Sequence, residues 1–87
     1  MPILSEFSGI KIYIYWDDHL PPHIHAEYSN FRALIDIDKC VVIKGILPIN
    51  KTNLVLSWCK LHKAELFDAW KKVCNHQMPL KITPLNQ

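Results

Sequence analysis

The chain has 87 residues, of which 49% are hydrophobic and 21% charged, and these values predict one folded domain rather than a disordered chain. Its formal net charge of +2 permits an anionic partner, but strong nucleic-acid binders usually carry a larger basic excess. No segment approaches the ~18 apolar residues that a membrane span requires, so we expect no membrane partner.

The cysteines and the N-terminal segment both indicate a cytoplasmic protein. Cys40, Cys59 and Cys74 are odd in number and share no short metal-ligand spacing, which favours free thiols in a reducing compartment. The first residues, MPILSEFSG, lack the basic region and long apolar run of a secretion signal.

The first half of the chain is predicted to form an antiparallel sheet. Isoleucines alternate with lysine and tyrosine over 10–15, and this period of two is typical of a strand. The segment DDHLPP interrupts the strand, because a proline disfavours helix at the residue before it. Further strands are expected over 23–28, 31–38 and 40–43, with a tight turn at Ser29–Asn30 and a connection over 45–50.

The second half of the chain has a helical pattern. Apolar residues fall on one broad stripe of a helical wheel: Leu54, Val55, Trp58, Leu61, Leu66, Ala69 and Val73. We therefore predict one long helix over about 51–74 and a short C-terminal tail. The expected fold is α+β, one domain over 1–87, in which a three- to four-stranded antiparallel meander over about 8–45 is packed by that helix.

The most distinctive stretch is WDDHLPPHIHAEY, residues 16–28, which holds three of the five histidines. In a strand that begins at His23, the side chains of His23, His25 and Glu27 point to one face and their neighbours to the other. Imidazoles two positions apart start ~6.5–7 Å from each other, and the two prolines restrict the chain just before them. Asp18 and His19 lie close enough in the sequence to fold back onto the same face.

Two chemistries fit this segment, and a structural role in which the rings bond backbone carbonyls is a third interpretation. In the first, His23 and His25 act as general base and general acid in metal-independent cleavage of RNA. Asp18 and His19 would orient them, and Lys11 or Arg32 would contact the phosphate. In the second, His23 and His25 bind a divalent metal, and His19 or Asp18 is the third ligand.

His62 and Tyr28 are further candidates. His62 lies near the middle of the apolar stripe, where a polar ring needs a partner, and Glu65 is three residues away. His62 is therefore either a core histidine bonded to Glu65 or a third group of the histidine site. Tyr28, with Tyr13 and Tyr15, either stacks on bases or flanks the core.

Almost the whole chain resembles a small bacterial family of uncharacterised domains. The resemblance rests on PILSEFSGIKIYIYWDDHLPPHIHAEYSNFRALIDI, followed by LP and NLVLSWCKLHKAELFDAW. The family signature D-H-x-P-P-H-x-H-A-x-Y falls on Asp18 to Tyr28, and the helix histidine matches at His62. Members are commonly encoded beside a second small protein, and the pair has been predicted to be a toxin–antitoxin system.

The resemblance and the histidines together lead to one main hypothesis and two alternatives. The main hypothesis is a toxin-like component of a type II toxin–antitoxin module, a metal-independent ribonuclease that binds RNA and a small cognate protein encoded by a neighbouring gene. The first alternative is a non-catalytic antitoxin or adaptor that binds its partner through a sheet edge, where a homodimer is also expected. The second is the histidine metal site, and no other cofactor is expected.

Overall fold

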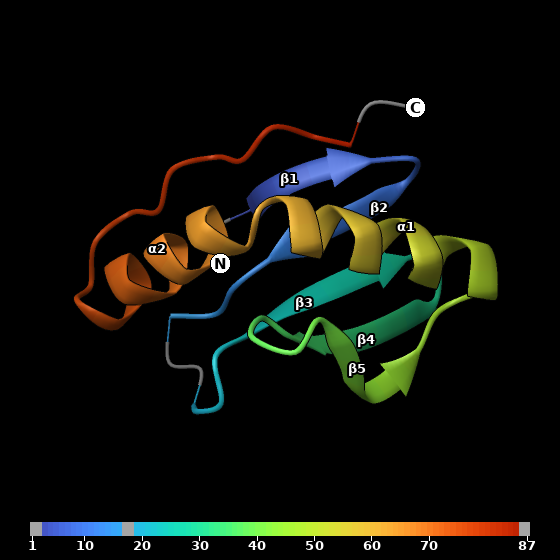
Figure 1. The fold of residues 1–87 in the computed structure, drawn as a ribbon, viewed down its shortest axis with the longest axis horizontal. Helices are drawn as coiled ribbons and strands as arrows, with labels where there is room; N and C mark the ends of the chain where they lie inside the picture. The colour runs from blue at the N-terminus through green and yellow to red at the C-terminus, as the bar shows by residue number, and fades with distance from the viewer. Residues whose placement is uncertain (1–2, 17–18, 86–87) are drawn as a thin grey trace.

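The computed structural model describes residues 3–16 and 19–85. It contains five strands and two helices, followed by an extended C-terminal segment (Figure 1). The elements are β1 (Ile3–Phe7), β2 (Ile10–Tyr13), β3 (His23–Tyr28), β4 (Phe31–Asp36), β5 (Val41–Ile46), α1 (Ile49–Leu61) and α2 (Lys63–Cys74). The prediction of an α+β fold is confirmed. Neither helix has the length and apolar content needed to span a bilayer.

The sheet is an antiparallel meander, in which the strands lie side by side in the order β1-β2-β3-β4-β5. The expected three or four strands are therefore wrong in number, because β1 was not predicted. Its sequence, ILSEF, does not alternate regularly, and a register shift between Ile3 and Ser5 interrupts its pairing with β2. The irregular pairing explains why a search for a period of two misses this strand.

The last strand is longer than the sequence predicts. β5 continues through Gly45 to Ile46, a segment that the sequence assigns to a connection. A register shift between Leu34 and Ile35 accommodates an extra residue in β5. Gly45 has a positive φ of 82°, and a side chain there would collide with the carbonyl oxygen of Arg32. Gly45 is thus part of the strand because only glycine allows this close approach.

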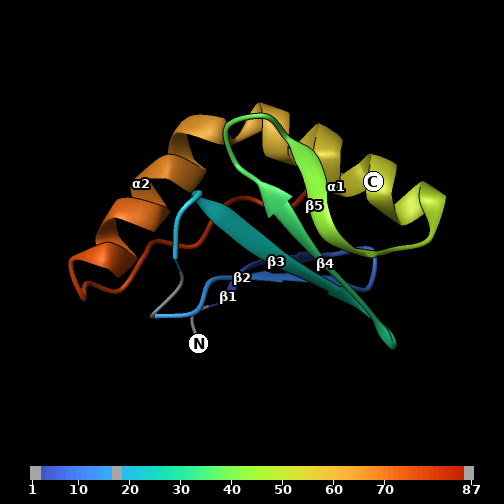
Figure 2. The same ribbon diagram turned by 90° about the horizontal axis from the view of Figure 1, so that it is seen from below.

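The single long helix is also wrong in detail, because the helical segment breaks at His62. The backbone of His62 (φ −114°, ψ 25°) leaves the helical region, ending α1 and starting α2. The break changes which side chains face the sheet: Leu61, expected on the apolar stripe, is 71% exposed. Both helices nevertheless cover the same face of the sheet (Figure 2).

The core lies between this sheet face and the two helices. Its fully buried side chains from β2, β3, β4 and the segments that follow β2 and β4 include Ile10, Ile12, Ile14, Ile24, Ile35 and Ile37. The helices contribute Val55, Trp58, Cys59 and Leu66, which are equally buried. The ring of Trp58 lies against Phe7 with 5.3 Å between centroids, so the core reaches β1 as well.

The C-terminal segment covers the β1 edge of the sheet. The amide of Ile82 donates a hydrogen bond to the Leu4 carbonyl at 2.8 Å, and Trp58 Nε1 donates to the Thr83 carbonyl at 2.9 Å. Within the described chain, β5 pairs only with β4 and is the other edge of the sheet. One edge is therefore covered by the chain itself, whereas the other presents unpaired strand backbone.

Ile35 tests this description of the core. Ile35→Ala should lower the free energy of unfolding by about 2–5 kcal/mol, because it leaves a cavity at a fully buried position of β4. Ile49→Ala, at a position 76% exposed, is the matched control and should change it by less than ~0.5 kcal/mol. Urea unfolding followed by circular dichroism measures both, and equal effects would contradict the assignment of the core.

Candidate functional site

The helices cover one face of the sheet and leave the other, the open face, uncovered (Figure 2). Ile24 and Ala26 of β3 are buried in the core on the helix side. Because side chains alternate along a strand, His25 and Glu27 lie on the opposite, open face and are half-buried, whereas His23 points to the same side but is buried at the start of β3. The expected division of β3 into two faces agrees with the burial of the residues from Ile24 to Glu27, but His23 is buried instead of open.

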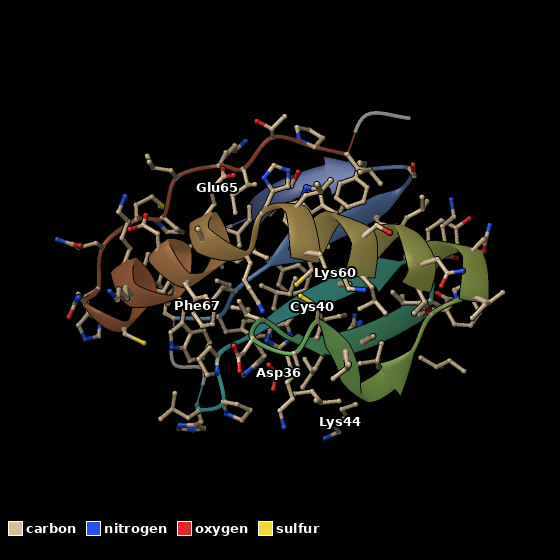
Figure 3. The ribbon with its side chains drawn as sticks, in the orientation of Figure 1. Asp36, Cys40, Lys44, Lys60, Glu65 and Phe67 are labelled. Atoms are coloured by element: carbon tan, nitrogen blue, oxygen red, sulfur yellow. The ribbon has the colours of Figure 1, made fainter. Side chains whose placement is uncertain are left out.

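A hollow of about 330 Å³ lies on the open face. Four neighbouring strands, β2 to β5, and the residues that follow β2 contribute to it. Its principal side chains are Tyr13, Tyr15, His25, Arg32, Leu34 and Lys44. Lys44 projects from β5 away from both helices (Figure 3). The hollow therefore combines one imidazole, two phenols and two cationic groups.

His25 is held in the hollow by aromatic neighbours. Its ring stacks on Tyr13 with 5.3 Å between centroids and 5° between planes. Tyr15 packs its edge against the same imidazole at 4.4 Å. These contacts fix the plane of the ring, yet His25 is only half-buried and lines the hollow.

His23 adjoins His25 but has a different environment. The two ring centroids are 5.2 Å apart, and the Trp70 ring centroid lies 5.4 Å from that of His23. His23 is only 8% exposed, and its Nδ1 donates a hydrogen bond to the Pro21 carbonyl at 2.7 Å. The structure thus brings the two imidazoles together, but His25 alone of the pair lines the hollow.

Glu27 connects Tyr13 of β2 with Arg32 of β4. It accepts a hydrogen bond from the Tyr13 hydroxyl at 3.1 Å and pairs with Arg32 Nε at 3.3 Å. Burial, followed by hydrogen bonds with Tyr15 and Glu27, raises the pKa of Tyr13 well above its usual range. Tyr13 therefore keeps its proton at alkaline pH, where an ordinary tyrosine ionises, and acts as a hydrogen-bond donor to Glu27.

The remaining predicted residues have separate environments. Lys11 is exposed and lies opposite Glu27 on β2, outside the lining of the hollow. Tyr28 faces the helices, where Lys51 Nζ lies 4.7 Å from its ring centroid. His19 is exposed in the segment before β3, and Asp18 lies outside the described residues.

His62 has the partner that its position predicts. Its Nδ1 is 2.6 Å from Glu65 Oε1, and its ring lies 5.4 Å from Trp58. These contacts are at the junction of α1 and α2, and His62 does not line the hollow. The structure therefore does not bring His62 into the site that contains His25.

The proposed metal ligands do not gather in the described part of the chain. No group of three His, Cys, Asp or Glu side chains among residues 3–16 and 19–85 could hold a metal ion. His19, His23 and His25 are thus not arranged as a metal site there.

Lys44 lines the hollow but was not expected from the sequence, and Tyr13 and Tyr15 were expected only to stack on bases or to flank the core. Tyr13 and Tyr15 carried a signal, because they alternate with isoleucines that belong to the core and must face the other side. Lys44 carried none, because the fourth strand was expected to end at Ile43.

Comparison with known proteins identifies a family without a described activity. The family model described as "Domain of unknown function (DUF4160)" matches residues 9–71, which include β2 to β5, α1 and most of α2. No curated protein and no solved structure matched the chain.

The raised pKa of Tyr13 predicts a pH dependence of stability. Above the ordinary tyrosine pKa of 10.0 the unfolded chain loses this proton while the folded chain keeps it, so stability falls as pH rises. Tyr13→Phe removes this contribution. The difference in free energy of unfolding between wild type and variant should therefore shrink from about pH 8 to about pH 11, by on the order of 1 kcal/mol. Urea titrations at both pH values measure it, and a constant difference would contradict the raised pKa.

Proposed function

The chain belongs to the DUF4160 family, and we propose that it is the toxin-like member of a bacterial type II toxin–antitoxin pair, acting as a metal-independent ribonuclease in the cytoplasm. One observation supports this proposal most directly: the open face places an imidazole and two cations around a single hollow. An acid–base group beside cations is what cleavage of an RNA phosphodiester requires when no metal takes part.

The cations and the phenols of the hollow suit RNA as a ligand. Arg32 and Lys44 can neutralise the phosphate, and Tyr15 offers an aromatic surface for an unpaired base. Single-stranded RNA can turn its bases outward onto the sheet face, whereas the bases of an RNA duplex are paired and stacked.

His25 is the general base of the proposed reaction. Its imidazole takes the proton from the ribose 2′-hydroxyl as that oxygen attacks phosphorus. The bond from phosphorus to the 5′-oxygen breaks, the 5′-oxygen takes up a proton from solvent, and a 2′,3′-cyclic phosphate remains. Arg32 and Lys44 stabilise the charge that gathers on the phosphorane.

His23 has a positioning role in this proposal instead of the acid role that the sequence suggested. Its Nδ1 is held by the Pro21 carbonyl, and its ring contacts both His25 and Trp70. A ring held in this way supports the orientation of His25 and does not line the hollow. The cognate protein of the pair, encoded by a neighbouring gene, would block access to this face.

His25→Gln tests the catalytic assignment. The variant should cleave RNA about 10²–10⁴-fold more slowly and relieve growth inhibition, because it removes the general base. His76→Gln is the matched control, because His76 is an exposed histidine that follows α2 and does not line the hollow. Cleavage of a labelled single-stranded RNA in chelator gives the rates, and circular dichroism checks the fold.

The proposal fails if wild-type protein, expressed without its neighbour, leaves both RNA and growth unaffected. It also fails if His25→Gln and His76→Gln cleave RNA equally well.

A second function, a non-catalytic adaptor, is favoured by the exposed apolar side chains around β5. Val41, Ile43 and Ile46 of this edge strand are 43%, 45% and 69% exposed, and Ile49 follows at 76%. Unpaired strand backbone flanked by apolar side chains is a surface that a partner strand can extend.

Ile46→Glu tests the adaptor function. The variant should weaken binding of the purified neighbouring protein at least tenfold, because it places a charge in the apolar surface. For an adaptor, the wild type should also show no RNA cleavage. Ile3→Glu, on the opposite edge strand, is the matched control at a position 44% exposed. Calorimetric titration measures both, and equal affinities would exclude β5 as the binding edge.

A further inference from the structure

The size of the hollow on the open face limits the ligand that it holds. At about 330 Å³ it is at the lower end of the range of ~300–1,000 Å³ that small-molecule sites occupy. A space of this size suits one nucleotide unit, and the other units of a polymer would lie outside the hollow. The polymer that crosses the sheet would therefore insert a single nucleotide here.

Two cations are placed to bracket one anion. Arg32 of β4 lies opposite Ile46, and Lys44 of β5 lies opposite Leu34, so Arg32 and Lys44 are diagonal neighbours on adjacent strands. Diagonal neighbours of this kind are ~7–8 Å apart, which is within reach of two long side chains. The ion pair between Arg32 Nε and Glu27 Oε2 restrains the guanidinium, which has five N–H donors in all.

The aromatic side of the hollow is equally fixed. Tyr15 packs edge-on against Tyr13 at 5.5 Å as well as against His25, so its ring contacts both members of the stacked pair. Leu34, half-buried, adds an apolar surface between this aromatic group and Lys44. A planar heterocycle can stack at the aromatic side while its phosphate reaches the cations.

We propose that the hollow binds one ribonucleotide through both its base and its phosphate, and that ribonucleoside 3′-monophosphates are its preferred small ligands. The preference for the 3′ isomer rests on the proposed function. Because His25 acts on the 2′-hydroxyl, the phosphate that lies between Arg32 and Lys44 is the one attached to the neighbouring 3′-oxygen. The 3′-monophosphate also forms when water opens the cyclic product, so it should inhibit cleavage competitively.

Calorimetric titration of the full chain with four probes tests the proposal. The probes are uridine 3′-monophosphate, uridine 5′-monophosphate, uridine and inorganic phosphate. The 3′-monophosphate should bind at least about fivefold more tightly than each of the others. Only this probe can stack its base at the aromatic side while a phosphate on the 3′-oxygen reaches the two cations.

Two variants locate the bound nucleotide. Lys44→Gln should weaken binding of the 3′-monophosphate about five- to tenfold and reduce its dependence on salt. Tyr15→Leu should weaken binding of the nucleotide while leaving that of inorganic phosphate unchanged. Lys71→Gln is the matched control, because Lys71 is an exposed lysine of α2 on the other side of the sheet.

The possible outcomes separate this inference from the proposed function. RNA cleavage without binding of any 3′-monophosphate overturns the inference and leaves the ribonuclease proposal in place. Binding that Lys44→Gln weakens, without RNA cleavage, supports the nucleotide site and overturns the ribonuclease. Equal affinities for the 3′ and 5′ isomers overturn the placement of the phosphate, and equal effects of Lys44→Gln and Lys71→Gln overturn the site itself.

Discussion

The alternation of side chains along β3 is the constraint on which both the fold and the candidate site depend. Ile24 and Ala26 complete the core under the helices, and the residues between and beside them form the open face. A shift of one residue in the pairing of β3 would turn His25 into the core and expose Ile24. Because burial of Ile24 opposes that shift, the hydrophobic core also fixes the position of the imidazole.

The open face is organised by contacts among its own side chains. Tyr13 links Glu27 to His25, since its hydroxyl bonds the carboxylate while its ring stacks on the imidazole. Glu27 in turn restrains Arg32. An imidazole, a phenol and a guanidinium are thus positioned by neighbours on three adjacent strands, which is the arrangement of supporting contacts that a functional group needs for a fixed geometry.

The sequence predicts the parts of this structure that depend on local pattern, and misses those that depend on tertiary contacts. Regular alternation is sufficient to find β2 to β4, and helical periodicity finds the apolar side chains of α1 and α2. The break at His62 was not predictable, because a helical wheel assumes one continuous helix and therefore places Leu61 and Leu66 on the same stripe. The different environments of His23 and His25 depend on Trp70 and the Pro21 carbonyl, and no spacing rule places these beside a strand histidine.

The hollow and the β5 edge share residues, so the two candidate functions are not independent. Lys44 belongs to β5 and lines the hollow, and Ile46 lies directly opposite Arg32. A partner strand paired with β5 would therefore lie beside both cations that are proposed to hold the phosphate. Acidic side chains on such a strand would neutralise these cations, and its bulk would narrow the hollow. Binding of a partner at this edge and binding of a nucleotide would then compete, which is the relation expected of a toxin and its antitoxin.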